Sequence, residues 1–197
     1  MADLWAARLD RPLTAAETAC LAALLPSERR QRLERTAPDK RREPLCAYGL
    51  LRLALRKRWG LTALPAIALG PLGKPAFPER PDICFSISHT DGAVLVGLSD
   101  QPVGVDIQVH RLVGAGLLRR FGAETVDVFF QSWVRREARA KRTGAPVELR
   151  GESPLAPEEE YWPLDTFPGF FAGVSAARGE APLLRTLDLE TLLRMIG

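Results

Sequence analysis

The spacing of apolar residues changes near residue 80, and this change limits the possible folds more than any other feature of the sequence. From Arg42 to Trp59 apolar residues recur about every 3.6 positions, which predicts a helix that Gly60 ends. Beyond residue 82 they alternate with polar residues, which predicts strands in ICFSISH, AVLVGLS and PVGVDIQV. Helices followed by strands, and then by helix and strand again, favour an α+β or mixed α/β fold.

The remaining segments extend this prediction. Residues 14–25 form a short helix that Thr14 and Glu17 open with capping-box spacing, and a basic helix follows in PSERRQRLERTA. Residues 117–142 return to helix, and GFFAGVSAA is the final short strand. We expect two halves, each a small sheet packed with helices: residues 1–99 and residues 100–197.

Positive charge is concentrated in one stretch of the chain. The 197 residues carry a net charge of +3, but residues 29–58 alone hold eleven basic and three acidic residues. This excess predicts an anionic partner, which is a polymer, a membrane surface or a small phosphorylated ligand. A module that grips nucleic acid or anionic lipid through its arginines is therefore one alternative.

Several classes of protein are disfavoured by what the sequence lacks. No apolar stretch approaches the roughly 18 residues of a membrane-spanning helix, and the first residues, MADLWAARLDRPL, have no apolar core of a signal peptide. Cys20, Cys46 and Cys84 form no CxxC pair, which disfavours a zinc site and a disulfide framework. We expect a cytoplasmic protein with buried free thiols and no membrane partner.

Two polar residues stand on one face of the strand PVGVDIQV. If its β-branched residues face the core, Asp106 and Gln108 share the opposite face, two positions apart. Oxygen ligands at this spacing can point at one metal ion. An exposed strand face explains the same pattern equally well, so both interpretations stay open on these residues.

The helix FFQSWVRREARAKRTG carries charge where core residues are expected. Its apolar stripe continues from Trp133 into Glu137 and then Lys141. A surface ion pair would explain the two charges but not their place below a tryptophan, so a metal ligand or a base is favoured for Glu137. The other face carries arginines expected in solvent: Arg135, Arg139 and Arg142.

Two further short motifs are weak signals when taken alone. Ser88 and His89 end a buried strand and form a plausible pair of phosphate donors, and Lys74–Pro75 lies in a rigid turn. Hard oxygen ligands, scattered cations and one histidine suit Mg²⁺ and phosphate chemistry better than a transition metal.

The order of four motifs, GKPAF, FSISHT, PVGVDIQ and WVRREARAK, resembles the 4′-phosphopantetheinyl transferases. The likeness is to the larger, monomeric type that serves the carrier proteins of peptide and polyketide synthases. It implies two pseudo-symmetric halves with the active site between them and a coenzyme A-binding N-terminal half. It also implies Mg²⁺-dependent transfer of phosphopantetheine from coenzyme A to a carrier-protein serine, with release of 3′,5′-ADP. Nucleic acid is not an expected partner.

The same resemblance assigns roles to individual residues. Metal ligands would be Asp106, Gln108 and Glu137. Catalytic groups would be Glu137, Lys141 and His89. Contacts to coenzyme A would come from Arg42, Lys74, Pro75, Ser88, His89, Arg136 and Lys141, with Arg42 placed on the 3′-phosphate.

The chain departs from the family pattern at three places. Gln108 stands where members commonly have Glu, and Arg136 stands where they have Lys. The segment between Asp106 and Trp133, which usually helps to contact the carrier protein, is shorter than expected. A member that binds coenzyme A but no longer transfers is therefore a second alternative.

Overall fold

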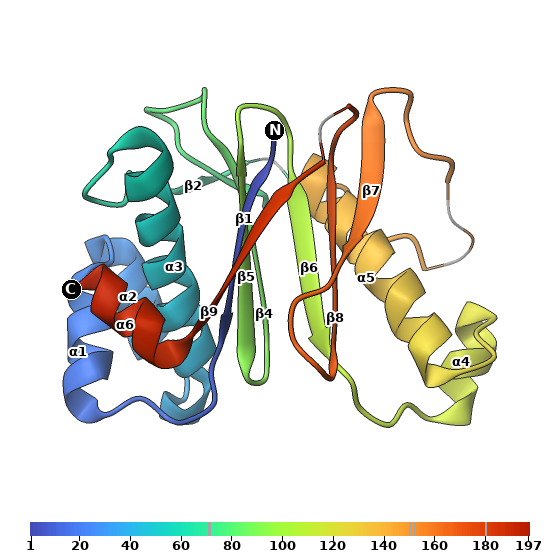
Figure 1. Cartoon of the computed structure of the whole chain (residues 1–197), viewed down its shortest axis with the longest axis horizontal. Coiled ribbons are helices and arrows are strands. Elements are labelled where there is room, and N and C mark those ends of the chain that lie inside the picture. The colour runs from blue at the N-terminus through green and yellow to red at the C-terminus, as the bar shows by residue number, and fades with distance from the viewer. Residues whose placement is uncertain (71, 150, 152, 180) are drawn as a thin grey trace.

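The computed structural model describes residues 1–70, 72–149, 151, 153–179 and 181–197. Two sheets lie side by side at the centre, with helices on their outer sides (Figure 1). The first sheet has the order β4 (Cys84–Thr90), β5 (Ala93–Ser99), β1 (Asp3–Arg8), β9 (Leu183–Asp188). The second has the order β6 (Gly104–Val109), β8 (Phe170–Ala177), β7 (Glu159–Leu164). The expected mixed α/β fold is confirmed.

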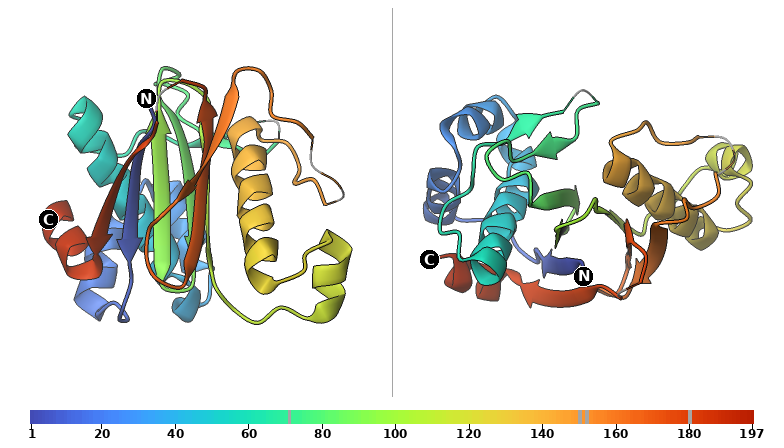
Figure 2. Two further views of the ribbon diagram at one scale, coloured as in Figure 1. Left: turned by 45° about the vertical axis from the view of Figure 1, so that its right-hand side comes forward. Right: turned by 90° about the horizontal axis from the view of Figure 1, so that it is seen from above.

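Helices from separate parts of the chain cover the two sheets, as the view from above shows (Figure 2). Beside the first sheet lie α1 (Ala15–Ala23), α2 (Ser27–Glu34), α3 (Arg42–Trp59) and α6 (Leu189–Ile196). Beside the second lie α4 (Ala115–Phe121) and α5 (Val126–Thr143). Smaller elements are the 3₁₀ turn Pro38–Lys40 and the hairpin of β2 (Ala68–Leu69) and β3 (Pro75–Ala76). No helix within the described ranges is long and apolar enough to cross a bilayer.

The predicted helix of residues 42–59 is confirmed, and it forms the core of the first half. Leu50, Leu51 and Leu55 are completely buried against the first sheet. Gly60 ends the helix with φ of 70°, a left-handed conformation that glycine adopts without strain. The capping box of Thr14 and Glu17 at the start of α1 is likewise confirmed.

A second core lies between the two sheets. Leu4 and Leu95 of the first sheet meet Val105, Ile107 and Val174 of the second, and all five are fully buried. Strands β1 and β5 are therefore covered on both faces, by helices on one side and by the second sheet on the other.

Two predictions for the C-terminal half are wrong. Residues 117–142 form two helices, because Gly122 ends α4 with φ of 62° and Thr125 caps the start of α5. The strand GFFAGVSAA is not the final element, since β9 and α6 follow it. Strands β1 and β7 also exist where no strand was predicted.

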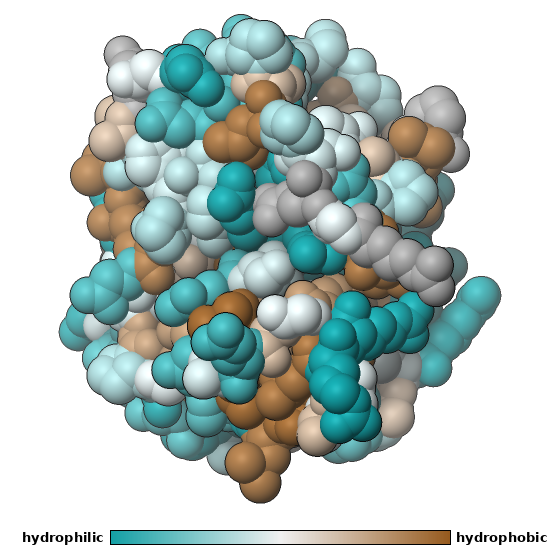
Figure 3. All heavy atoms as spheres, turned by 90° about the vertical axis from the view of Figure 1, so that its right-hand side faces the viewer, coloured by the Kyte–Doolittle hydropathy of each residue, from teal (hydrophilic) through white to brown (hydrophobic). Residues whose placement is uncertain are grey.

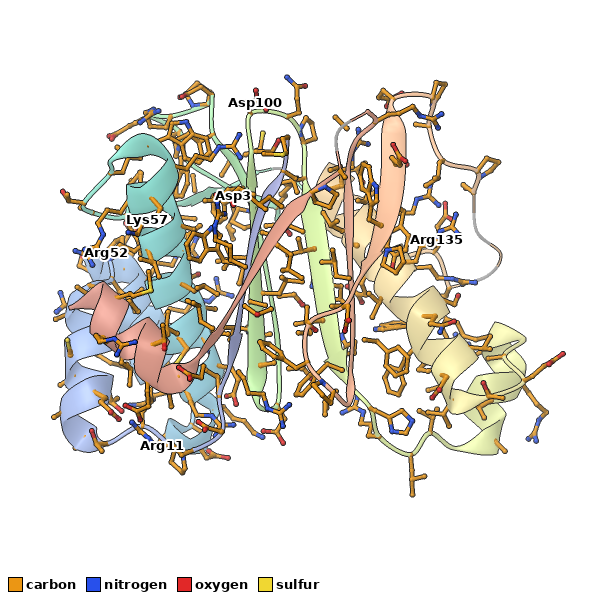
Figure 4. The ribbon with its side chains drawn as sticks, in the orientation of Figure 1. Asp3, Arg11, Arg52, Lys57, Asp100 and Arg135 are labelled. Carbon is orange, nitrogen blue, oxygen red and sulfur yellow. The ribbon has the colours of Figure 1, made fainter. Side chains whose placement is uncertain are left out.

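The end of the chain packs against its beginning. Strand β9 runs parallel to β1, and Asp3 forms an ion pair with Arg185 across the two strands. Arg11 binds both Glu17 and Glu190, which ties α6 to the start of α1; Asp3 and Arg11 are labelled in Figure 4. The division at residue 99 stays a prediction, with β9 forming part of the first sheet and α6 lying beside it.

Helix α5 approaches strand β6 very closely at Gly104. A Cβ atom at this position would lie 2.0 Å from the backbone oxygen of Ala138 and 2.2 Å from the backbone nitrogen of Arg142. Only glycine fits, because backbone atoms cannot move aside as a flexible side chain can.

We therefore expect Gly104→Ala to lower the free energy of unfolding by about 1–3 kcal/mol or more, as overpacking does. Urea denaturation followed by circular dichroism measures this change. Gly116→Ala is the matched control, because nothing lies within 4 Å of the added methyl group and alanine favours the helix. Equal unfolding midpoints for the two variants would contradict the close approach.

Candidate active site

Three side chains from three elements meet where β4 lies against β6 and α5 packs on β6. The Ser88 hydroxyl of β4 donates a hydrogen bond of 2.7 Å to Oδ1 of Asp106 on β6. Nζ of Lys141, on α5, lies 2.6 Å from the same oxygen and 2.9 Å from the Ser88 hydroxyl. We call Ser88, Asp106 and Lys141 the central cluster.

Asp106 is buried because the face of β6 that carries it packs against α5. Its side chain is 1% exposed, whereas that of Lys141 is 30% exposed. The alternative of an exposed strand face is therefore wrong. A carboxylate removed from water needs a cation and hydrogen bonds to remain charged, and Lys141 and Ser88 supply them.

Gln108 and Glu137 complete the group that was predicted to hold a metal ion. Nε2 of Gln108 donates to the second oxygen of Asp106 at 3.1 Å. Glu137 lies one helical turn before Lys141, and its carboxylate accepts no hydrogen bond within the described residues. Burial, and then the charge of Asp106, raise the pKa of Glu137, while Lys141 opposes them.

The oxygen donors of this group fit Mg²⁺ in type. No set of three His, Cys, Asp or Glu side chains suited to a metal exists among the described residues. Two neighbouring carboxylates, Asp106 and Glu137, are nevertheless what magnesium uses when substrate phosphates and water supply its other ligands. The half-buried Glu137, repelled by Asp106 and without a hydrogen-bond partner in the described chain, is a place where a cation would be stabilised.

His89 follows Ser88 on β4 and lies beside the central cluster. Part of its surface stays in solvent, yet loss of hydration lowers the pKa of the imidazole, and the positive charge of Lys141 lowers it further. His89 is therefore neutral at pH 7, and one ring nitrogen can donate a hydrogen bond.

Lys74 lies next to the site, but its amine binds backbone carbonyl groups and not the central cluster. Its Nζ donates to the carbonyl oxygens of Val103 and Arg142, at the start of β6 and the end of α5. Burial lowers the pKa of the Lys74 amine. The contact links the β2–β3 hairpin to β6 and α5, two of the three elements that carry the central cluster.

Arg42 and Arg136 do not line the cavity around the central cluster. The guanidinium of Arg42 binds Glu43 and lies 3.1 Å from Asp91. Arg136 donates to the carbonyl of Glu148 and stacks over Phe121 at 5.3 Å. The roles that the resemblance gave to both arginines stay predictions.

Three cavities meet at strand β4, where Ile87 lines all of them. The central cavity, of about 800 Å³, contains the central cluster, His89, Gln108 and Glu137. The hairpin cavity, of about 330 Å³, lies between Lys74–Pro75 and the side of α5 that carries Glu137. The basic cavity, of about 290 Å³, shares His89 with the first and Pro75 with the second.

The basic cavity contains residues that sequence reasoning did not single out. Arg29, Arg32 and Tyr48 line it together with His89. The signal was the excess of positive charge in residues 29–58, but it could not tell these two arginines from their neighbours on a helix without an apolar stripe.

An apolar wall forms the outer part of the central cavity. It includes Leu112, which is 95% exposed, Leu117, Phe121 and Trp133. Apolar side chains gather in the lower part of the face that carries α4, beside hydrophilic ones (Figure 3). Arg111 and Arg120 line the same cavity.

Two arginines of α5 that were predicted in solvent lie inside the protein. Arg142 is 7% exposed, and Arg139 forms an ion pair with the buried Glu159 of β7 at 3.1 Å. Glu159 also accepts a hydrogen bond from Ser175 of β8. The helix that carries Glu137 and Lys141 is thus fixed to all three strands of the second sheet.

Comparison with known proteins gives this site its context. No model of a protein family matches the chain. A putative 4′-phosphopantetheinyl transferase of Synechocystis is 30% identical, covering 80% of this chain and 70% of that protein. Two 4′-phosphopantetheinyl transferases of Bacillus subtilis are also similar. One is 27% identical, covering 72% of this chain and 70% of that protein. The other is 25% identical, covering 94% of this chain and 97% of that protein.

A mixed α/β protein with this likeness is a transferase enzyme. The chain belongs to the 4′-phosphopantetheinyl transferase family, whose members are named for the transfer of phosphopantetheine.

We expect Lys141→Met to raise the pKa of His89, because a repelling positive charge is lost. Proton NMR titration of the imidazole measures the change, and Lys141→Arg, which keeps the charge, is the control. Since the folded pKa of His89 lies below its ordinary value, the unfolded chain binds more protons between the two, and stability falls as pH falls through this window. An unchanged pKa in Lys141→Met would mean that burial alone sets it.

Proposed function

We propose that this protein transfers the 4′-phosphopantetheine group from coenzyme A to a serine of an apo carrier protein, with Mg²⁺ and with release of 3′,5′-ADP. The observation that carries the proposal is the meeting of the three cavities at Ile87 of β4, next to Ser88 and His89 in the chain and beside the central cavity that holds Asp106, Glu137 and Lys141. A nucleotide, a pantetheine arm and an incoming hydroxyl need three approaches to one phosphorus atom, and three cavities supply them.

The nucleotide end of coenzyme A is assigned to the basic cavity. Arg29 and Arg32 carry the charge that a 3′-phosphate requires, and Tyr48 offers an aromatic ring. They suit this role better than Arg42, because Glu43 and Asp91 already neutralise that guanidinium. Residues 1–99 then hold the nucleotide and supply His89 to the reacting end, and residues 100–197 supply Asp106, Glu137 and Lys141.

Residues of the central cavity are assigned to the bond exchange at the β-phosphorus of coenzyme A. The serine oxygen bonds to the β-phosphorus of coenzyme A while the bond from this phosphorus to the bridging oxygen breaks, and 3′,5′-ADP leaves with the electron pair. Glu137 takes the serine proton, directly or through a water, and its raised pKa makes it a better acceptor. Lys141 and His89 donate to the pyrophosphate oxygens, where charge builds.

Magnesium is assigned to Asp106 and Glu137, with the amide oxygen of Gln108 as a third donor. When bound there it neutralises charge on the pyrophosphate. Ser88 and Lys141 hold the Asp106 carboxylate in place for this role.

The carrier protein is assigned to the apolar wall of the central cavity. Leu112 and Leu117 offer exposed apolar surface, and Arg111 and Arg120 suit an acidic partner. Because both halves contribute to one site, the proposal is for a monomer that meets its carrier protein transiently in the cytoplasm, without nucleic acid or membrane.

A protein that binds coenzyme A without transferring is the second candidate. It is favoured by the hydrogen bonds that Lys141 and Gln108 make to Asp106, since both would have to rearrange around a metal ion.

The test is incubation with an apo carrier protein, coenzyme A and Mg²⁺, read by intact mass. We expect one added phosphopantetheine per carrier, and none with EDTA. Glu137→Gln should lower turnover by about 10²- to 10⁴-fold, the usual worth of a general base, with modest loss of coenzyme A affinity. Binding of coenzyme A without any mass increase would select the second candidate, and full activity of Glu137→Gln would remove its role.

Gln108→Glu should lower the Mg²⁺ concentration needed for half-maximal activity, because it adds a third carboxylate to the site. Activity measured across a magnesium series detects the shift, with Gln101→Glu on the exposed β5–β6 turn as the control for added charge. An unchanged or higher magnesium requirement would show that Gln108 is not a ligand.

A further inference from the structure

The two sheets are joined by a ladder of side-chain hydroxyls. Three backbone N–H groups of β6 donate to three hydroxyls of β4, at 3.1 to 3.2 Å. The pairs are Val105 to Ser86, Ile107 to Ser88 and Val109 to Thr90. Each pair is 19 residues apart in sequence, so the two strands run in parallel with constant register. We call these three contacts the hydroxyl ladder.

The ladder replaces an ordinary strand pairing. Strands β4 and β6 contact each other but belong to different sheets, which pair with β5 and β8 on their other edges. The seam is therefore held by side chains rather than by backbone carbonyls. A buried N–H group without an acceptor costs free energy. Removal of a hydroxyl therefore leaves one N–H group of β6 unpaired and lowers the stability of the folded protein.

The middle rung of the ladder is also part of the central cluster. A serine hydroxyl can donate one hydrogen bond and accept two. Ser88 accepts from the Ile107 N–H and from Lys141, so its own proton is directed to Asp106. All three capacities are used, and the direction of the hydroxyl depends on where β6 lies relative to β4.

We propose that Ser86 and Thr90, the outer rungs, are positioning residues of the transferase site. They hold β6 in register so that Ser88 faces Asp106. The smallest displacement of β6 that keeps the same face toward β4 is two residues. It would place Gly104 or Gln108 opposite Ser88 and break the hydrogen bonds of the central cluster. The catalytic part of this inference rests on the proposed function, but the ladder itself does not.

Thr90→Val tests the ladder with little change of shape, because valine keeps the branching and loses only the acceptor. We expect the Val109 amide to exchange its hydrogen about two- to tenfold faster, the worth of one net hydrogen bond. The double variant Ser86→Ala with Thr90→Val should lower kcat by about tenfold or more through misplacement of Asp106. The KM for coenzyme A should change less, because the nucleotide is assigned to the first half.

Two controls separate positioning from general stability. Thr90→Ser keeps the hydroxyl and should restore both exchange and kcat. Thr186→Val makes the same chemical change on the exposed face of β9 and should leave both at the wild-type value.

Three outcomes would overturn the inference. These are unchanged exchange at Val109 in Thr90→Val, faster exchange with unchanged kcat in the double variant, and Thr90→Ser as impaired as Thr90→Val. If the wild-type protein transfers nothing, the proposed function fails on its own. Hydrogen exchange at the Ile107 amide, in the middle rung, then tests the inference. Faster exchange in the double variant supports the positioning role of Ser86 and Thr90, and an exchange rate equal to that of the wild type overturns it.

Discussion

The close approach of α5 to β6 at Gly104 is the constraint on which the site depends. With no side chain between them, the helix lies directly on the strand, and Lys141 reaches Asp106 two residues along from the glycine. Arg139, through Glu159, and Lys74, through the carbonyl of Arg142, hold the helix in this position from two other sides. A polar cluster in a buried seam is tolerated because the backbone around it cannot move apart.

The electrostatics of the seam follow from this arrangement. Asp106 is neutralised by Lys141, while Glu137 remains as a second carboxylate whose pKa the first one raises. One ammonium beside two carboxylates leaves the seam short of positive charge, whereas the neighbouring basic cavity has it in excess. A ligand with phosphates and a divalent cation would balance both regions at once.

The sequence predicted those parts of the fold that have a clear apolar period or many strand-forming residues. Residues 42–59 and the strand that ends in His89 have clear periods, and polar residues within an apolar pattern identified Asp106 and Glu137. Strand β1, DLWAAR, was missed because its residues do not alternate and alanine has little preference for strands, whereas β5, which is just as buried, contains valine. Strand β7 was missed because Pro163 lies within it, and a proline in a sequence argues against a strand.

Contacts between distant segments could not be predicted in the same way. That Ser88 meets Asp106 depends on a seam between two sheets, and the 19-residue offset carries no local pattern. The burial of Arg142 depends on the second sheet covering a face of α5 that the sequence predicts to be solvent-exposed, since seven residues of this helix are charged. Such features follow from tertiary packing and not from the spacing of residues along one element.

The pairing of β9 with β1 has a consequence for how the protein is made. During synthesis β1 leaves the ribosome first, but its parallel partner begins at Leu183. Until then one edge of β1 stays open, and the surface of α3 that α6 covers, including Gly49 against Ile196, stays exposed. The first sheet can form early with β5 and β4, yet it is completed only once residues 183–196 have been synthesised, so β9 and α6 close an edge of the sheet that stays open during most of the synthesis of the residues before them.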